Sequence, residues 1–92
     1  MSGCARDFLI SGRVQGVGYR YFAHEAAERH GIRGYARNLF NGDVEVHAEG
    51  DEAAVQLFKQ DLQQGPRMSN VTKVVETDAA VTGTYPSFLI RG

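Results

Sequence analysis

The sequence of 92 residues lacks the features that mark several large classes of protein. Its single cysteine, Cys4, cannot form a disulfide within the chain, which argues against a secreted scaffold held together by disulfides. The sequence also has no apolar signal segment at its N-terminus and no apolar run near the roughly 20 residues that a membrane span needs. We therefore expect a cytoplasmic protein without a membrane partner.

An excess of charge of one sign is also missing. Ten Lys and Arg residues face eleven Asp and Glu residues, which gives a formal net charge of −1. Nucleic-acid-binding domains typically carry a basic surface, so we expect no nucleic-acid partner, and any anion site must be local. The hydrophobic fraction of 42% and the charged fraction of 23% are those of a globular chain. The length predicts a single domain over residues 1–92.

The spacing of apolar residues predicts five strands and two helices. In order, these are a strand at 7–12, a helix at about 21–30, strands at 32–39 and 43–50, a helix from Asp51 to Gly65, a strand at 71–77 and a short edge strand around Phe88 and Ile90. Within 43–50 the residues alternate strictly, which predicts one buried and one solvated face. Val44, Val46 and Ala48 should be buried, and Glu45, His47 and Glu49 should face water.

This βαββαβ order with an added C-terminal strand predicts an α+β fold, a ferredoxin-like α/β sandwich whose antiparallel sheet carries both helices on one face. A helix joins the first two strands, so they should run parallel with the third strand between them. At about 4.8 Å between neighbouring strands, the loop after the first strand and the end of the second lie roughly 10 Å apart. Arg20 and Asn38 occupy those two places.

The stretch SGRVQGVGYRYF (residues 11–22) lacks a helix cap and a carboxylate. It offers no Ser, Thr, Asp or Asn at the predicted helix start, whereas Asp51 is well suited to cap the second helix. Gly16 and Gly18 let the backbone curl so that its N–H groups form an anion-binding concavity at the helix N-terminus, and Arg13 and Arg20 flank it. These residues suit a phosphate, but they are equally compatible with a tight turn flanked by solvated arginines.

Several known site types are absent. A dinucleotide-binding fingerprint needs a third glycine where the chain has Tyr21, and the P-loop lysine is missing because Lys59 and Lys73 are the only lysines. The three histidines are spread over two predicted elements, with His24 and His30 in the first helix and His47 in a strand, and no histidine pair, cysteine cluster or carboxylate pair has the spacing of a metal site or an acid–base pair. We therefore expect neither nucleotide binding nor a metal or other cofactor.

Two longer motifs carry a resemblance to a known family. GRVQGVGYR (residues 12–20) and GYARNLFNGDVEVHAEG (residues 34–50) closely resemble the two signatures of the acylphosphatase family, and the likeness extends over nearly the whole chain. One difference is at the end, where the family often has Arg followed by an aromatic residue and this chain has Arg91 and Gly92. That difference bears only on a terminal packing contact.

The resemblance implies a metal-independent enzyme that hydrolyses the carboxyl–phosphate bond of small acyl phosphates and releases inorganic phosphate. By this resemblance Arg20 binds the phosphate and Asn38 positions the attacking water. The predicted phosphate cradle is the backbone of Gln15, Gly16, Val17, Gly18, Tyr19 and Arg20. The leaving group is a stable carboxylate, so the chemistry needs no general acid and depends on charge stabilisation and alignment.

Other functions stay open. One alternative is a non-catalytic anion-binding or regulatory module of the same fold. A second is a fragment of a larger carbamoyl-transfer protein, which the intact length and the initiating Met disfavour. A third is RNA binding, which the near-neutral charge disfavours. The sequence does not identify the acyl group of the substrate, and we expect a monomer.

Some residues have simpler interpretations. Tyr19 and Tyr35 suit packing, His30 suits the C-terminal end of its helix, and Cys4 has no predicted role near a frayed terminus.

Overall fold

The protein is described by a computed structural model that covers residues 3–92. Its elements follow the predicted order: β1 (Gly3–Arg13), α1 (Tyr19–His30), β2 (Arg33–Asn38), β3 (Val44–Asp51), α2 (Glu52–Gln64), β4 (Asn70–Ala79) and β5 (Phe88–Arg91). The first helix begins two residues before the predicted start, so Arg20 lies in its first turn. No helix in residues 3–92 has the length and apolar character to span a membrane.

The five strands form one sheet in the order β4-β1-β3-β2-β5. Strand β3 pairs antiparallel with both β1 and β2, so β1 and β2 run parallel on either side of it, as predicted. Strand β5 lies at an edge but pairs parallel to β2, from Gly34 opposite Phe88 to Arg37 opposite Arg91. The sheet is therefore mixed, and the prediction of an antiparallel sheet holds only for the other four strands. As a result β2 and β5 end side by side.

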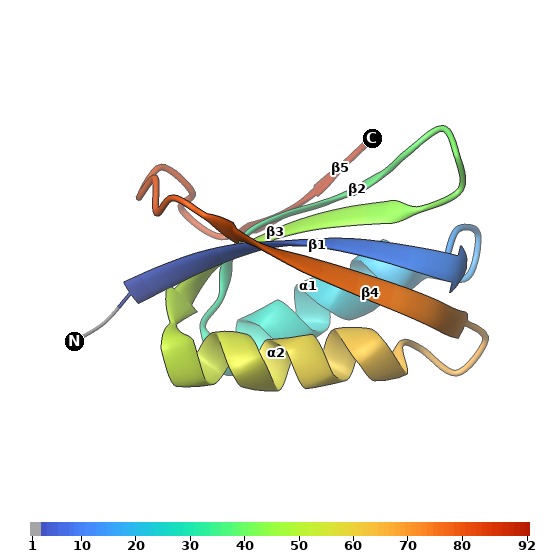
Figure 1. Cartoon of the computed structure of the whole chain (residues 1–92), viewed down its shortest axis with the longest axis horizontal. Helices are drawn as coiled ribbons and strands as arrows, with labels where there is room; N and C mark the ends of the chain where they lie inside the picture. The colour runs from blue at the N-terminus through green and yellow to red at the C-terminus, as the bar shows by residue number, and fades with distance from the viewer. Residues whose placement is uncertain (1–2) are drawn as a thin grey trace.

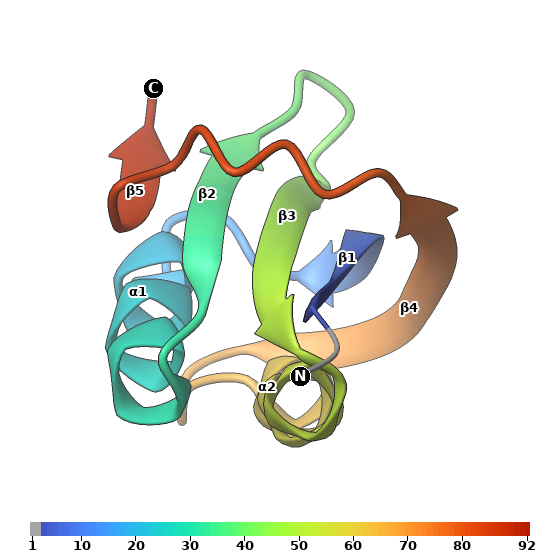
Figure 2. The same cartoon turned by 90° about the vertical axis from the view of Figure 1, so that its left-hand side faces the viewer.

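Both helices cover the same face of the sheet, as Figures 1 and 2 show. Helix α1 buries Tyr19 and three alanines against it, and α2 buries Val55, Phe58 and Leu62 at helical spacing. Short alanine side chains let α1 approach the sheet closely. The predicted inward residues of β3, Val44, Val46 and Ala48, are fully buried in this core. The two-layer α+β fold predicted from the sequence is therefore confirmed.

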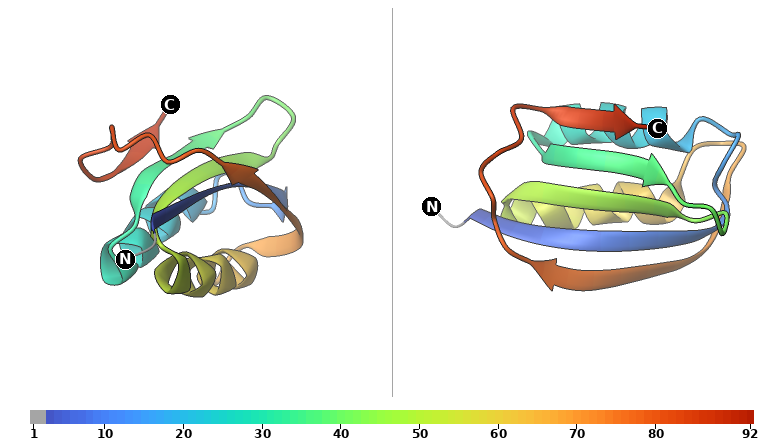
Figure 3. Two further views of the ribbon diagram at one scale, coloured as in Figure 1. Left: turned by 60° about the vertical axis from the view of Figure 1, so that its left-hand side comes forward. Right: turned by 90° about the horizontal axis from the view of Figure 1, so that it is seen from above.

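The outer face of the sheet differs from the prediction. His47 and Glu49 were expected in water, but their exposed fractions are only 7% and 3%. The reason is the connection from β4 to β5, residues 80–87, which we call the crossing segment. It runs over the outer face from one edge strand to the other, at the end of the sheet where β5 begins (Figures 2 and 3). Strand periodicity correctly assigned the face but could not show what covers it.

A second correction concerns Asp51. It is the N-cap residue of α2, as predicted, but its side chain makes no capping hydrogen bond, and the same is true of Gly18 at the start of α1. Both helices therefore begin without a side-chain cap. The contrast between a capped α2 and an open α1, from which the sequence suggested a function for α1, does not exist in the structure.

Candidate active site

The loop between β1 and α1, residues 14–18, is shaped by two glycines. Gly16 and Gly18 have φ angles of 73° and 77°, in the left-handed region that side chains disfavour. Val14 is buried in the core and fixes the loop where it leaves β1. Gly16 and Gly18 stand on either side of Val17, and left-handed residues at such spacing curl the backbone so that successive N–H groups point to one side. The positive φ angles of Gly16 and Gly18 are compatible with the anion cradle that the sequence predicts, and that role of the loop stays a prediction.

The start of α1 adds unpaired donors to this loop. The first intrahelical bond runs from the Phe22 N–H to the Gly18 carbonyl at 3.0 Å, so the N–H groups of Tyr19, Arg20 and Tyr21 lie before it and have no acceptor within the helix. The first turn contains no acidic residue, and Gly18 offers no side-chain acceptor. Because a helix N-terminus carries partial positive charge, this end of α1 favours an anion.

Arg20 and Asn38 meet at the same cavity. Arg20 comes from the first turn of α1, and Asn38 is the last residue of β2. A cavity of about 200 Å³ is lined by both, together with Val14, Gly16, Gly18, Tyr19, Tyr21 and Ile90. The parallel course of β1 and β2 places the two residues together, as the predicted topology required. The cavity thus combines a guanidinium, a neutral amide and the open helix start.

Two residues of the predicted cradle direct their side chains elsewhere. Gln15 donates from Nε2 to the carbonyls of Leu39 at 2.7 Å and Asp43 at 2.8 Å, so its side chain ties the loop to the β2–β3 hairpin. It lines a neighbouring hollow of about 570 Å³ that also includes Asn38 and Phe40. Val17 packs against the core. Only the main chain of Gln15 and Val17 is therefore left to serve the predicted cradle.

Arg20 is held by a residue that sequence reasoning missed. Its Nη1 donates to the main-chain carbonyl of Arg91, the last residue of β5, at 2.6 Å. Ile90 of the same strand lines the cavity. The sequence indicated a fifth strand at an edge but not its direction, and only the parallel pairing with β2 brings its end to the site.

The remaining candidates lie outside the cavity. Arg13 is exposed at the end of β1 and is not among the residues that line it. His30, at the end of α1, pairs with Asp61 of α2 at 2.8 Å, a partner that the helix-dipole interpretation did not include. Cys4 lies in β1 opposite Gly50, within a regular strand rather than a frayed end. Residues 3–92 contain no group of three His, Cys, Asp or Glu side chains placed to hold a metal ion.

Comparisons with known proteins agree with this fold and these motifs. The sequence model of the family described as Acylphosphatase matches residues 6–90. An acylphosphatase of Solibacter usitatus is 49% identical over 87 residues, which cover 95% of this chain and 90% of that protein. The crystal structure of acylphosphatase from Bacillus subtilis superposes with a TM-score of 0.91 at 34% identity, covering 96% of this chain and 98% of that one.

A likeness also extends to a part of a much larger protein. The structure of full-length HypF in its phosphate- and nucleotide-bound form matches with a TM-score of 0.87 at 26% identity; the match covers 99% of this chain but 12% of that one. The Solibacter protein, by contrast, matches over nearly its full length. The family model, the sequence identity and the superposition all point the same way: this chain belongs to the acylphosphatase family.

Proposed function

We propose that this chain hydrolyses acyl phosphates by direct attack of water on phosphorus, in the cavity shared by Arg20 and Asn38. The phosphoryl group lies in the cradle of residues 15–20. The observation that carries the proposal is the convergence of Arg20, Asn38 and the two left-handed glycines on one cavity at the uncapped start of α1.

Arg20 supplies charge and geometry. A guanidinium has five N–H donors, and the bond to the Arg91 carbonyl uses one of them, so the others are free to bind phosphate oxygens. That bond also restricts the rotation of the side chain. A pre-positioned cation lowers the cost of stabilising the negative charge of the phosphoryl group in the transition state.

Asn38 orients the water. An amide is not a base at neutral pH, but a loose phosphoryl transition state engages the nucleophile only weakly, so orientation is the main requirement. The water oxygen forms a bond to phosphorus as the bond from phosphorus to the acyl oxygen breaks. A phosphate oxygen accepts the water proton, and the products are a carboxylate and inorganic phosphate. The leaving carboxylate is stable as an anion and needs no acid.

The test is hydrolysis of acetyl phosphate by the purified chain in the presence of a metal chelator, alongside Arg20→Ala and Asn38→Ala. We expect Arg20→Ala to lose both turnover and inhibition by inorganic phosphate, and Asn38→Ala to lose turnover but keep phosphate affinity. Unchanged turnover in either variant would refute the role given to that residue. A pH–rate profile in which an essential group titrates near neutral pH would contradict the proposed mechanism, which uses no general acid or base.

The alternative is a non-catalytic anion-binding module, since the same fold serves many roles. It predicts that the unmodified chain binds inorganic phosphate without hydrolysing acetyl phosphate.

A further inference from the structure

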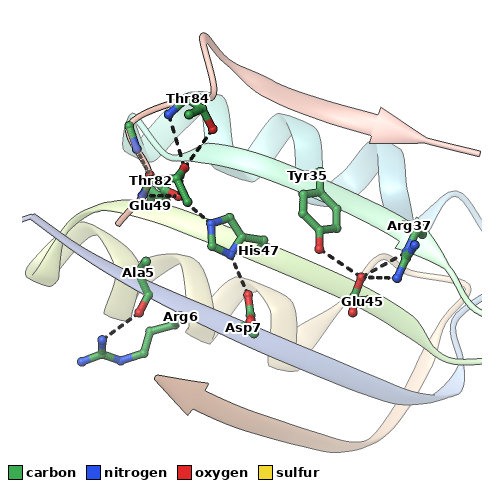
Figure 4. Close-up of polar contacts among 11 residues, drawn as sticks. Ala5, Arg6, Asp7, Tyr35, Arg37, Glu45, His47, Glu49, Thr82 and Thr84 are labelled. Atoms are coloured by element: carbon green, nitrogen blue, oxygen red, sulfur yellow. Dashed lines mark hydrogen bonds and ion pairs between the residues drawn. The ribbon is translucent and has the colours of Figure 1, made fainter. Parts of the chain in front are cut away.

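The outer face of the sheet holds a buried charged network that the proposed chemistry does not use. His47 donates from Nδ1 to Asp7 Oδ1 and from Nε2 to Glu49 Oε2, both at 2.6 Å. Glu49 accepts three more hydrogen bonds from the crossing segment: from the Thr82 N–H at 3.1 Å, the Thr82 hydroxyl at 2.7 Å and the Gly83 N–H at 3.1 Å. Figure 4 shows these contacts converging on His47 and Glu49. A carboxylate with these donors pins an irregular segment that would otherwise be loose.

Pinning the crossing segment places Tyr85 over the sheet. The Tyr85 ring centre lies 5.4 Å from that of His47 and 5.9 Å from that of Tyr35, and Tyr35 stacks on His47 at 5.8 Å. Tyr35 is fixed in turn by a hydrogen bond from its hydroxyl to Glu45 at 3.1 Å. We call Tyr35, His47 and Tyr85 the aromatic cage.

Two rings of the cage, those of Tyr35 and Tyr85, hold the side chain of Arg91. The guanidinium carbon of Arg91 lies 4.3 Å from the ring centre of Tyr35 and 5.7 Å from that of Tyr85, within the range of cation–π attraction. The carbonyl of the same residue accepts the 2.6 Å bond from Arg20. Arg91 is the last residue of a short edge strand, where its pairing with Arg37 of β2 ends, so its side-chain contacts add to that pairing in holding the end of the strand. The contacts run without a gap from Glu49 to the active-site arginine.

We propose that Tyr85 is a positioning residue: as part of the aromatic cage it fixes Arg91, and thereby the carbonyl that holds the Arg20 guanidinium in the cavity. The proposal rests on the function proposed above, in which Arg20 binds the phosphoryl group. Tyr85 itself does not line the cavity, and it acts only through Arg91.

The test compares Tyr85→Ala with Tyr85→Phe, which keeps the ring face, and with Ser87→Ala. Ser87 is exposed in the same crossing segment, and the hydrogen bond that its main-chain carbonyl accepts from the Gly34 N–H is unaffected by loss of the hydroxyl.

Two measurements are made on each variant: kcat and KM for acetyl phosphate, and the Nε–Hε signal of Arg20 in nitrogen-15 NMR spectra. We expect Tyr85→Ala to sharpen and shift the Arg20 signal through faster motion. Its kcat/KM should fall by about tenfold to a hundredfold, the cost of a misplaced group. Tyr85→Phe and Ser87→Ala should behave as the unmodified chain.

A double-mutant cycle separates positioning from a general loss of structure. In an Arg20→Ala background, Tyr85→Ala should cause no further loss, because the group that it positions is gone. An additive loss, an unchanged Arg20 signal or an equal effect of Ser87→Ala would overturn the inference. If the unmodified chain fails to hydrolyse acetyl phosphate while Tyr85→Ala still alters the Arg20 signal, the proposed function is refuted and the positioning of Arg20 by Tyr85 is supported.

Discussion

The hydroxyl of Tyr19 donates a 2.6 Å hydrogen bond to the main-chain carbonyl of Leu62, and both residues are buried. Tyr19 is the first residue of α1, and Leu62 lies in the last turn of α2, where main-chain carbonyls have no N–H donor within the helix. The bond joins the start of one helix to the end of the other. It thereby holds the open N-terminus of α1 beside the candidate active site.

Replacement of Tyr19 by Phe should destabilise the protein by about 1–2 kcal/mol, because it leaves the buried Leu62 carbonyl without a donor. Burial of this tyrosine also raises the pKa of its hydroxyl, so the group stays a donor at neutral pH. The measurement is urea-induced unfolding. Tyr21→Phe is the control, since Tyr21 is exposed on the same helix and its replacement should leave the unfolding midpoint unchanged. Equal stability of Tyr19→Phe and the unmodified chain would contradict the prediction.

Two glycines should respond differently to replacement by alanine. Gly18 has a positive φ angle, and the space where a Cβ would lie is open. Gly18→Ala should therefore destabilise the protein only through backbone strain, by about 1–2 kcal/mol. Gly34 also has a positive φ angle, but a Cβ there would overlap the carbonyl of His47 on β3. Gly34→Ala must therefore separate two paired strands and should lower the free energy of unfolding much further. Urea unfolding of both variants checks the order, which would be wrong if Gly18→Ala were the less stable.

The sequence predicts those parts of this protein that depend on local pattern and chain connectivity. Alternation in β3 identified the three residues that it buries in the core beneath the helices, and the helix between β1 and β2 implied that these two strands run parallel, which placed Arg20 near Asn38. The crossing segment has no periodicity, so nothing local indicated that it would bury His47 and Glu49. The direction of β5, and hence the Arg91 carbonyl at the site, likewise depends on contacts between distant residues.

Replacement of Asn38 by Asp tests whether this residue orients water or activates it as a base. A carboxylate beside the bound phosphoryl group repels it, so we expect kcat/KM at neutral pH to fall by about 100-fold or more. Activity should recover partly as the pH falls toward the ordinary aspartate pKa of about 3.9, where the side chain becomes neutral. The measurement is a pH–rate profile for acetyl phosphate hydrolysis, with Asn38→Ala as the pH-insensitive reference. A faster reaction at neutral pH would instead indicate that a base helps the water.

The His47–Glu49 pair should give the stability of the protein a maximum in mildly acidic solution. Burial acts to raise the pKa of Glu49, but hydrogen bonds from His47, Thr82 and Gly83 outweigh it and lower the pKa from 4.5 to about 2. Burial acts to lower the pKa of His47, but its bonds to Glu49 and Asp7 outweigh it and raise the pKa above 6.5. Both groups are therefore charged in the folded protein between about pH 4.5 and 6.5.

Each side of this maximum has its own cause. A lowered carboxyl pKa stabilises the fold above pH 4.5, and this contribution, on the order of 3 kcal/mol, is lost as the pH falls toward 2. A raised histidine pKa stabilises the fold below 6.5 and is lost as the pH rises through the folded-state value. The measurement is the free energy of unfolding in urea as a function of pH, from about pH 2 to above the raised histidine pKa. On the acid side of the maximum, stability should fall less steeply in Glu49→Gln than in the unmodified chain, and on the alkaline side it should fall less steeply in His47→Gln. If Glu49→Gln kept the acid limb of the unmodified chain, the loss of stability would have to come from other carboxylates, and the buried pair would not be its cause.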